Sequence, residues 1–136
     1  PASRITIVDP LVTESRQIHQ TAGNTCEVVQ LRGRLHEVDI EPHDTVVCLG
    51  MSVYDSNFGE QSSYEVFNCL CNEAETVILG VPVEWEESVD QANKLISTLP
   101  HEKSVDISMD FSNSDVEDVV QVHNKRRFLV FRNKKR

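Results

Sequence analysis

Short hydrophobic runs, rich in Val and Ile, recur along the chain between stretches of polar and turn-forming residues. The runs cover residues 4–8, 26–31, 45–49, 75–81 and 104–109. Runs of this length that end near Gly, Pro or small polar residues are typical of strands with one or both faces buried. The pattern therefore predicts five strands.

The run at 45–49 is the longest unbroken apolar run in the first half of the chain, and Gly50 follows it. We expect it to be the central strand of a sheet. In an open α/β sheet, ligands bind at the loops that follow the carboxyl ends of the strands. The polar loop at 50–57, which contains Ser52, is therefore a candidate ligand site, although an ordinary solvated turn would have the same residues.

Apolar residues at helical spacing lie between these predicted strands. The pattern predicts a helix over 11–21 that opens at Pro10 and has Leu11, Ser15 and Ile18 on one face, and a short helical turn over 35–40. It also predicts a helix capped by Ser62 or Ser63 and another over 84–99. The end of the chain is ambiguous. Residues 119–123 and 127–131 can form a hairpin, or the second of these segments can be helical.

Strands that alternate with helices at this spacing indicate an α/β fold of three layers. We expect an α/β/α arrangement around a mainly parallel, flavodoxin-like sheet of about five strands. A chain of 136 residues corresponds to about one domain. We assign residues 1–124 to this α/β domain and 125–136 to a basic C-terminal segment, which is either part of the domain or its tail.

The charge is distributed unevenly along the chain. The net charge is −9, yet seven of the 13 basic residues and no acidic residue fall within 125–136. All 22 acidic residues and the remaining six basic residues lie within 1–124, which gives this part of the chain a formal charge of −16. The basic residues of the segment are Lys125, Arg126, Arg127, Arg132, Lys134, Lys135 and Arg136. A basic end on an acidic body is typical of an interaction segment.

Two aromatic residues, Phe128 and Phe131, lie among these cations. Cations can pair with phosphates while aromatic rings stack on unpaired bases, so the segment is a candidate RNA-binding site. Two alternatives stay open. Residues 128–131 can be a last core strand, and 134–136 can be a solubilising end or a nuclear-import signal.

The four cysteines do not form a disulfide or metal-binding pattern. Cys48 lies within a predicted strand, and Cys69 and Cys71 are two positions apart on a predicted helix, where they face different sides. We expect no metal and no cofactor. No segment has the length of a membrane span, and the first residues contain no signal-peptide core, so we expect no membrane association and an intracellular, cytoplasmic or nuclear, location.

Several segments, in order, resemble the SGNH (GDSL-like) hydrolase superfamily. Residues 8–12 (Val-Asp-Pro-Leu-Val) occupy the place of the family's Gly-Asp-Ser block, and 31–35 (Leu-Arg-Gly-Arg-Leu) resemble its second, glycine-containing block. Residues 46–52 resemble the strand that enters the third block, and 77–82 the strand after it. The resemblance implies an SGNH-hydrolase-like α/β/α scaffold.

The residues that perform catalysis in that family differ here. Pro10 stands where the family has its serine nucleophile, and the oxyanion-hole asparagine would fall at Ser52 or near Asn57. The family's last block has Asp three residues before His, whereas Val120 precedes His123 at that distance. An esterase needs nucleophile, base and oxyanion donors together. The resemblance therefore implies a degenerate, non-catalytic member of the family.

The sequence predicts a non-catalytic binding module that engages a protein partner through its acidic body, or RNA through its basic C-terminal segment. One alternative is a diverged esterase that uses Ser52 with His123. Another is a receiver-like signalling domain, because Asp9 follows the first predicted strand as an acidic residue does in receivers. Such a domain would lack the phospho-acceptor, since the third strand ends in Gly50.

Overall fold

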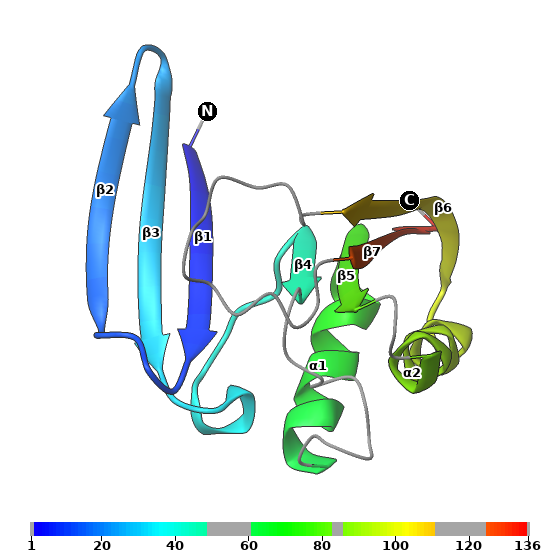
Figure 1. The fold of residues 1–136 in the computed structure, drawn as a ribbon. Coiled ribbons are helices and arrows are strands. Elements are labelled where there is room, and N and C mark those ends of the chain that lie inside the picture. The colour runs from blue at the N-terminus through cyan, green and yellow to red at the C-terminus, as the bar shows by residue number, and fades with distance from the viewer. Residues whose placement is uncertain (1, 49–60, 83–85, 111–124, 136) are drawn as a thin grey trace. The chain divides into compact units, whose positions relative to one another are not determined.

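A computed structural model describes residues 2–48, 61–82, 86–110 and 125–135, and its ribbon is shown in Figure 1. The chain forms two compact units, Pro1–Glu41 and Pro42–Arg136. Each unit contains one mixed sheet. Neither of the α-helices that the structure describes has the length and hydrophobicity of a membrane-spanning segment.

The first unit contains a three-stranded sheet, called sheet A. Its strands are β1 (Ala2–Asp9), β2 (Ser15–Thr21) and β3 (Asn24–Arg32), in the order β1-β3-β2. β1 runs parallel to β3, and β2 is antiparallel to it. A short 3₁₀ helix, η1 (Leu35–Glu37), follows the sheet, where the sequence predicts a helical turn.

The predicted helix over 11–21 is wrong, because the second half of this segment is strand β2. A two-residue turn at 22–23 joins β2 to β3, and Gly23 takes a φ of 79° there. Positive φ costs glycine little, so the turn favours a hairpin. Ile18, one of the residues expected on the buried face of that helix, is 65% exposed. Pairing with β3 thus decides the structure of the segment.

The second unit contains a four-stranded sheet, called sheet B, and two helices. Its elements are β4 (Thr45–Cys48), α1 (Gln61–Glu73), β5 (Thr76–Pro82), α2 (Glu86–Ser97), β6 (His101–Asp110) and β7 (Lys125–Asn133). The strand order is β4-β5-β7-β6. β4 runs parallel to β5, and β7 is antiparallel to both of its neighbours.

Both helices lie on one side of sheet B (Figure 1). Alternate side chains of the central strands point toward them, because successive residues of a strand face opposite sides. Fully buried side chains fill this layer, and those of β5 and β7 are Val77, Leu79, Leu129 and Phe131. The helices contribute Phe67, Cys71, Ala92, Leu95 and Ile96. The second unit is therefore a two-layer structure with its core between the sheet and the helices.

The predicted three-layer α/β/α fold with a mainly parallel, five-stranded sheet is wrong. Two mixed sheets of three and four strands take its place, and each contains a single parallel pair among the described strands. The C-terminal segment inserts between β5 and β6 and reverses the direction of the sheet. Hydrophobic periodicity locates strands along the chain but does not specify their order or direction.

The strand expected at the centre of the sheet is at its edge. Among the described strands β4 pairs with β5 alone, and the side chain of Val47 is 53% exposed. The centre of sheet B is formed by β5 and β7. Helical structure for 127–131 is also wrong, since this segment belongs to β7. The loop at 50–57 lies outside the described residues.

Candidate functional site

The predicted site residues divide into those the structure describes and those it does not. Ser52, His123 and Arg136 lie outside the described residues, so the esterase pair of Ser52 with His123 stays a prediction. Asp9, at the end of β1, accepts a hydrogen bond from the amide of Leu11 at 2.7 Å through Oδ1. It therefore stabilises the turn after β1.

The basic segment forms strand β7 and the turn after it. Alternation places Arg126, Phe128, Val130 and Arg132 on one face of sheet B, whereas Arg127 lies on the opposite face. Lys134 and Lys135 follow the strand and are exposed. The cations that are close in sequence therefore do not form one surface.

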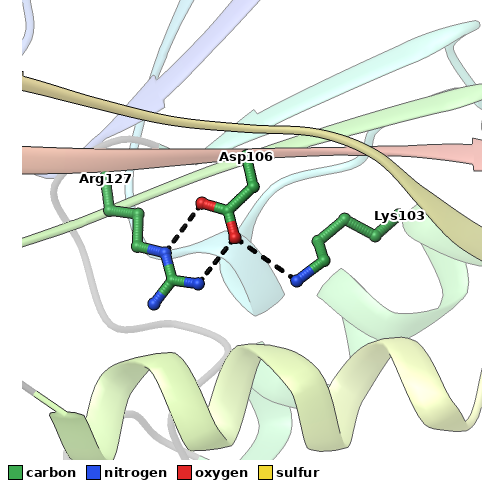
Figure 2. Close-up of polar contacts among 3 residues, drawn as sticks. All are labelled: Lys103, Asp106 and Arg127. Carbon is green, nitrogen blue, oxygen red and sulfur yellow. Dashed lines mark hydrogen bonds and ion pairs between the residues drawn. The ribbon is translucent and has the colours of Figure 1, made fainter.

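Arg127 lies on the face of sheet B where the helices pack, and it is engaged within the fold. Its Nε donates to Oδ1 of Asp106 at 2.8 Å, and its Nη2 donates to Oδ2 at 2.6 Å. Lys103 places its Nζ 3.3 Å from the same Oδ2 (Figure 2). These contacts join β6 to β7. Arg127, which the sequence assigns to RNA binding, is bound to a carboxylate in this structure.

A β-bulge brings Lys103 and Asp106 to the same side of the sheet. The register of β6 against β7 shifts between Lys103 and Val105. Residues three apart on a regular strand point to opposite faces, and one extra residue restores them to the same face. The bulge thus builds a site in which one carboxylate holds two cations.

The electrostatics of Asp106 follow from this geometry. Hydrogen bonding from Arg127, together with the nearby Lys103, lowers the pKa of the Asp106 carboxyl from 3.8 to about 2. The same hydrogen bond raises the pKa of Arg127. The pair therefore stays ionised at neutral pH and stabilises the sheet as an ion pair.

The other face of sheet B presents apolar side chains away from the helices. We call it the open face and define it by Val47, Ile78, Val105, Ile107, Phe128 and Val130. Val47 and Ile107 are 53% and 50% exposed. An apolar cluster of this kind across a sheet is a feature of interaction surfaces.

Cations lie along the same face of β7 as this apolar cluster. On that face Arg126 precedes Phe128 and Arg132 follows Val130, so the two arginines bracket the apolar pair along the strand. Arg132 donates from Nη1 to Oγ1 of Thr76 at 3.3 Å. Among the described residues, Arg132, Lys134 and Lys135 have no carboxylate partner. We call these three residues the basic rim; alternation places Arg132 on the open face, and Lys134 and Lys135 follow the end of β7.

His101 is a buried polar residue that the sequence pattern does not reveal. It begins β6, and its Nε2 lies 2.9 Å from the carbonyl oxygen of Ala74, while its buried Nδ1 has no partner among the described residues. Asn133 donates to the same carbonyl at 3.4 Å. Because the carbonyl only accepts, Nε2 carries the proton. The two side chains tie the ends of β6 and β7 to the end of α1.

The Cys71 thiol is held in its protonated form by burial. All four cysteines are free, and Cys48 and Cys71 are buried. Burial raises the pKa of the Cys71 thiol, and the nearby Cys48 raises it further. Cys71 therefore stays protonated and behaves as a small apolar side chain. Within the described ranges, no group of three or more His, Cys, Asp or Glu could hold a metal ion.

The comparisons with known proteins give no family for this chain. The sequence matches no protein-family model and no curated protein. The resemblance to SGNH hydrolases therefore stays a prediction, and the three-layer fold that it implies is the one that the structure contradicts. The candidate site rests on the geometry of sheet B.

Proposed function

We propose that this chain is a non-catalytic binding module that docks a protein partner on the open face of sheet B. The single observation in support is the contrast between the two faces of the sheet. One face is filled by α1 and α2, and the other presents half-exposed Val47 and Ile107. Burying such residues against a partner contributes about 25 cal/mol per Å² of apolar area.

The basic rim indicates the chemistry of the partner. Arg132, Lys134 and Lys135 carry charges that no described carboxylate neutralises. Opposite charge at the edge of an interface guides association and sets orientation. The partner surface is therefore an apolar patch flanked by Asp or Glu side chains.

RNA is the second candidate, supported by the position of Phe128 on the same face of β7 as Arg126 and Arg132. An aromatic ring between cations suits an unpaired base. The rest of the open face is aliphatic, however, and aliphatic side chains do not stack on bases as aromatic rings do. The acidic remainder of the chain also repels phosphate. A protein partner therefore suits this face better.

Comparative capture from a nuclease-treated cell lysate tests the proposal. The baits are the wild-type chain, an Ile107→Lys variant on the open face, and an Ile18→Lys variant as a matched control on the exposed β2 of sheet A. Binding proteins should be retained by the first and third baits and reduced at least about tenfold on the second, because the interface would bury an unpaired charge. Higher salt should weaken capture, since the rim contributes charge pairs.

Two results would count against this function. Equal capture by all three baits would mean that the open face is not the docking surface. Capture that occurs from an untreated lysate and disappears after nuclease treatment would favour the RNA alternative.

A further inference from the structure

The two faces of sheet A differ in charge. Alternation places Arg4, Arg16 and Glu27 on one face, which we call the charged face. The two arginines lie 3.6 and 3.4 Å from the carboxylate oxygens of Glu27. The opposite face, which we call the neutral face, is formed by residues other than Asp, Glu, Lys and Arg. They are Ser3, Ile5 and Ile7 of β1, Ser15, Gln17 and His19 of β2, and Cys26, Val28 and Gln30 of β3.

The neutral face has an apolar centre. Ile5 lies opposite Val28, and Val28 lies opposite Gln17, so these three residues form one row across the sheet. Ile7 lies in the next row, opposite Gln30. Ile5 and Ile7 are 51% and 38% exposed. The face therefore presents apolar side chains to solvent within a ring of uncharged polar ones.

The first unit has little core of its own. Among its described residues, Val29 is the one hydrophobic side chain that is buried, and it lies on the charged face. A small sheet depends on a hydrophobic face that is covered by a further layer. The neutral face, where the isoleucines are exposed, is the place at which such a layer would bury apolar surface.

We propose that the neutral face packs, sheet on sheet, against the neutral face of a second copy of this chain. The charge of the chain favours this occupant. Copies with a net charge of −9 repel one another, so two of them approach most easily through a surface without charged side chains. Ser and Gln side chains both donate and accept hydrogen bonds, so the polar ring is complementary to itself. The open face of sheet B differs, because its basic rim needs an acidic partner.

The packing of two such faces follows from their symmetry. In a two-fold dimer the same residues form both sides of the contact. Sheets that pack face to face lie about 10 Å apart, so Ile5, Ile7 and Val28 of each copy would interdigitate between them. This contact uses side chains of the face and none of the backbone groups at the edges of the sheet.

The strength of the dimer and its dependence on salt also follow. One face of three short strands buries less area than a stable interface does, so association is weak and depends on concentration. Higher salt should strengthen it, because salt screens the repulsion between two acidic chains. Docking on the open face of sheet B should respond to salt in the opposite direction.

Sedimentation velocity of the full chain over a wide concentration range should show a monomer–dimer equilibrium. Ile5→Lys should raise the dissociation constant at least about tenfold, because each copy would bury a lysine charge in the contact. Gln17→Lys should do the same from β2, at the edge of sheet A away from β1. Ile18→Lys is the matched control on the charged face, where Ile18 is 65% exposed, and it should leave the equilibrium unchanged. Circular dichroism of each variant establishes that the fold is retained.

Cysteine labelling tests the same face in the wild-type protein. Cys26 lies on the neutral face and is half-buried, whereas Cys69 is exposed on α1. Alkylation by an excess of maleimide, followed for each cysteine by mass spectrometry, should become slower at Cys26 as the protein concentration rises. The rate at Cys69 should not change, because access to that thiol does not depend on the dimer.

Four results would overturn the inference: a monomer at every protein and salt concentration, a dimer that is insensitive to Ile5→Lys or to Gln17→Lys, a dimer weakened equally by Ile18→Lys, or a constant labelling rate at Cys26 while the dimer forms. A dimer abolished by Ile107→Lys instead would also overturn it and would assign self-association to the open face of sheet B. Because the docking proposal concerns that other sheet, failure of one proposal leaves the other standing.

Discussion

The carboxylate of Asp106 accepts two hydrogen bonds from Arg127, at 2.8 and 2.6 Å, and lies 3.3 Å from Lys103. Because of this contact, the cations of the basic segment do not all have the same role. Arg127 stabilises the junction of β6 and β7, whereas Arg132, on the opposite face, lies on the surface proposed for a partner. Residue type and position in the sequence do not distinguish these two arginines, but the alternation of the strand does.

The same contact makes stability depend on pH. Because the folded pKa of Asp106 is about 2 and its usual value is 3.8, the unfolded chain takes up the proton first as the pH falls. The contribution of the ion pair is present above about pH 4 and is lost as the pH falls toward 2. Asp106→Asn should therefore lower the free energy of unfolding by about 0.5–1 kcal/mol at pH 7.

Urea denaturation of wild type and variant at pH 7 and again below pH 3 measures this effect. The difference between the two proteins should shrink as the pH falls. Asp39→Asn is the control, because Asp39 is exposed and forms no ion pair with another described residue. It should change the stability little at either pH. An Asp106 effect that is equally large at both pH values would show that the ion pair is not its cause.

At the scale of the elements, the sequence predicts most strands and helices but not the structure of β2 or the position of β7 in its sheet. The strands at 4–8, 26–31, 75–81 and 104–109 and the two helices that follow residues 60 and 84 are confirmed, because each follows from a local apolar pattern. The predicted cap at Ser62 or Ser63 is wrong, since α1 already includes both residues. The helical spacing of Leu11, Ser15 and Ile18 predicts a helix where the structure has β2. Its pairing with β3 is tertiary and overrides that weak preference.

The hairpin between β2 and β3 depends on Gly23. A side chain there would meet nothing within 4 Å, but the φ of 79° is unfavourable for L-residues with a Cβ. Gly23→Ala should therefore destabilise the chain by about 1 kcal/mol, whereas Gly23→Asn should cost less, because Asn tolerates this conformation. Thermal or urea unfolding of the two variants provides the comparison. Equal stability of wild type and Gly23→Ala would contradict the claim that the hairpin depends on a positive φ at Gly23.

The order of the strands could not be predicted from local patterns, because β7 pairs with strands that are distant in the sequence. β7 reaches the centre of sheet B because its apolar residues 129 and 131 complete the layer that packs on the helices, opposite Leu79 and Val77. Its partner strands begin 49 and 24 residues earlier in the chain. Periodicity within β7 gives its two faces but not its neighbours, so the sheet predicted to be parallel is a mixed one.

At the scale of the whole molecule, the chain contains two compact units, each built on a mixed sheet. The predicted interaction segment is part of the fold of the second unit, as strand β7. Of the candidate site, the sequence could predict the charge of 125–136 and its interleaved aromatics. It could not predict that Phe131 is buried while Phe128 lies on the open face, because that difference depends on which face of the sheet the helices cover.

The proposed docking surface can be tested most directly by site-specific photo-crosslinking. A benzophenone side chain in place of Ile107 lies on the open face, and the same group in place of the exposed Lys94 on α2 serves as the control. On irradiation in cells, the group at 107 should form a discrete crosslink to a partner protein, and the group at 94 should not. Equal crosslinking from both positions, or crosslinking from 94 alone, would contradict docking on the open face of sheet B.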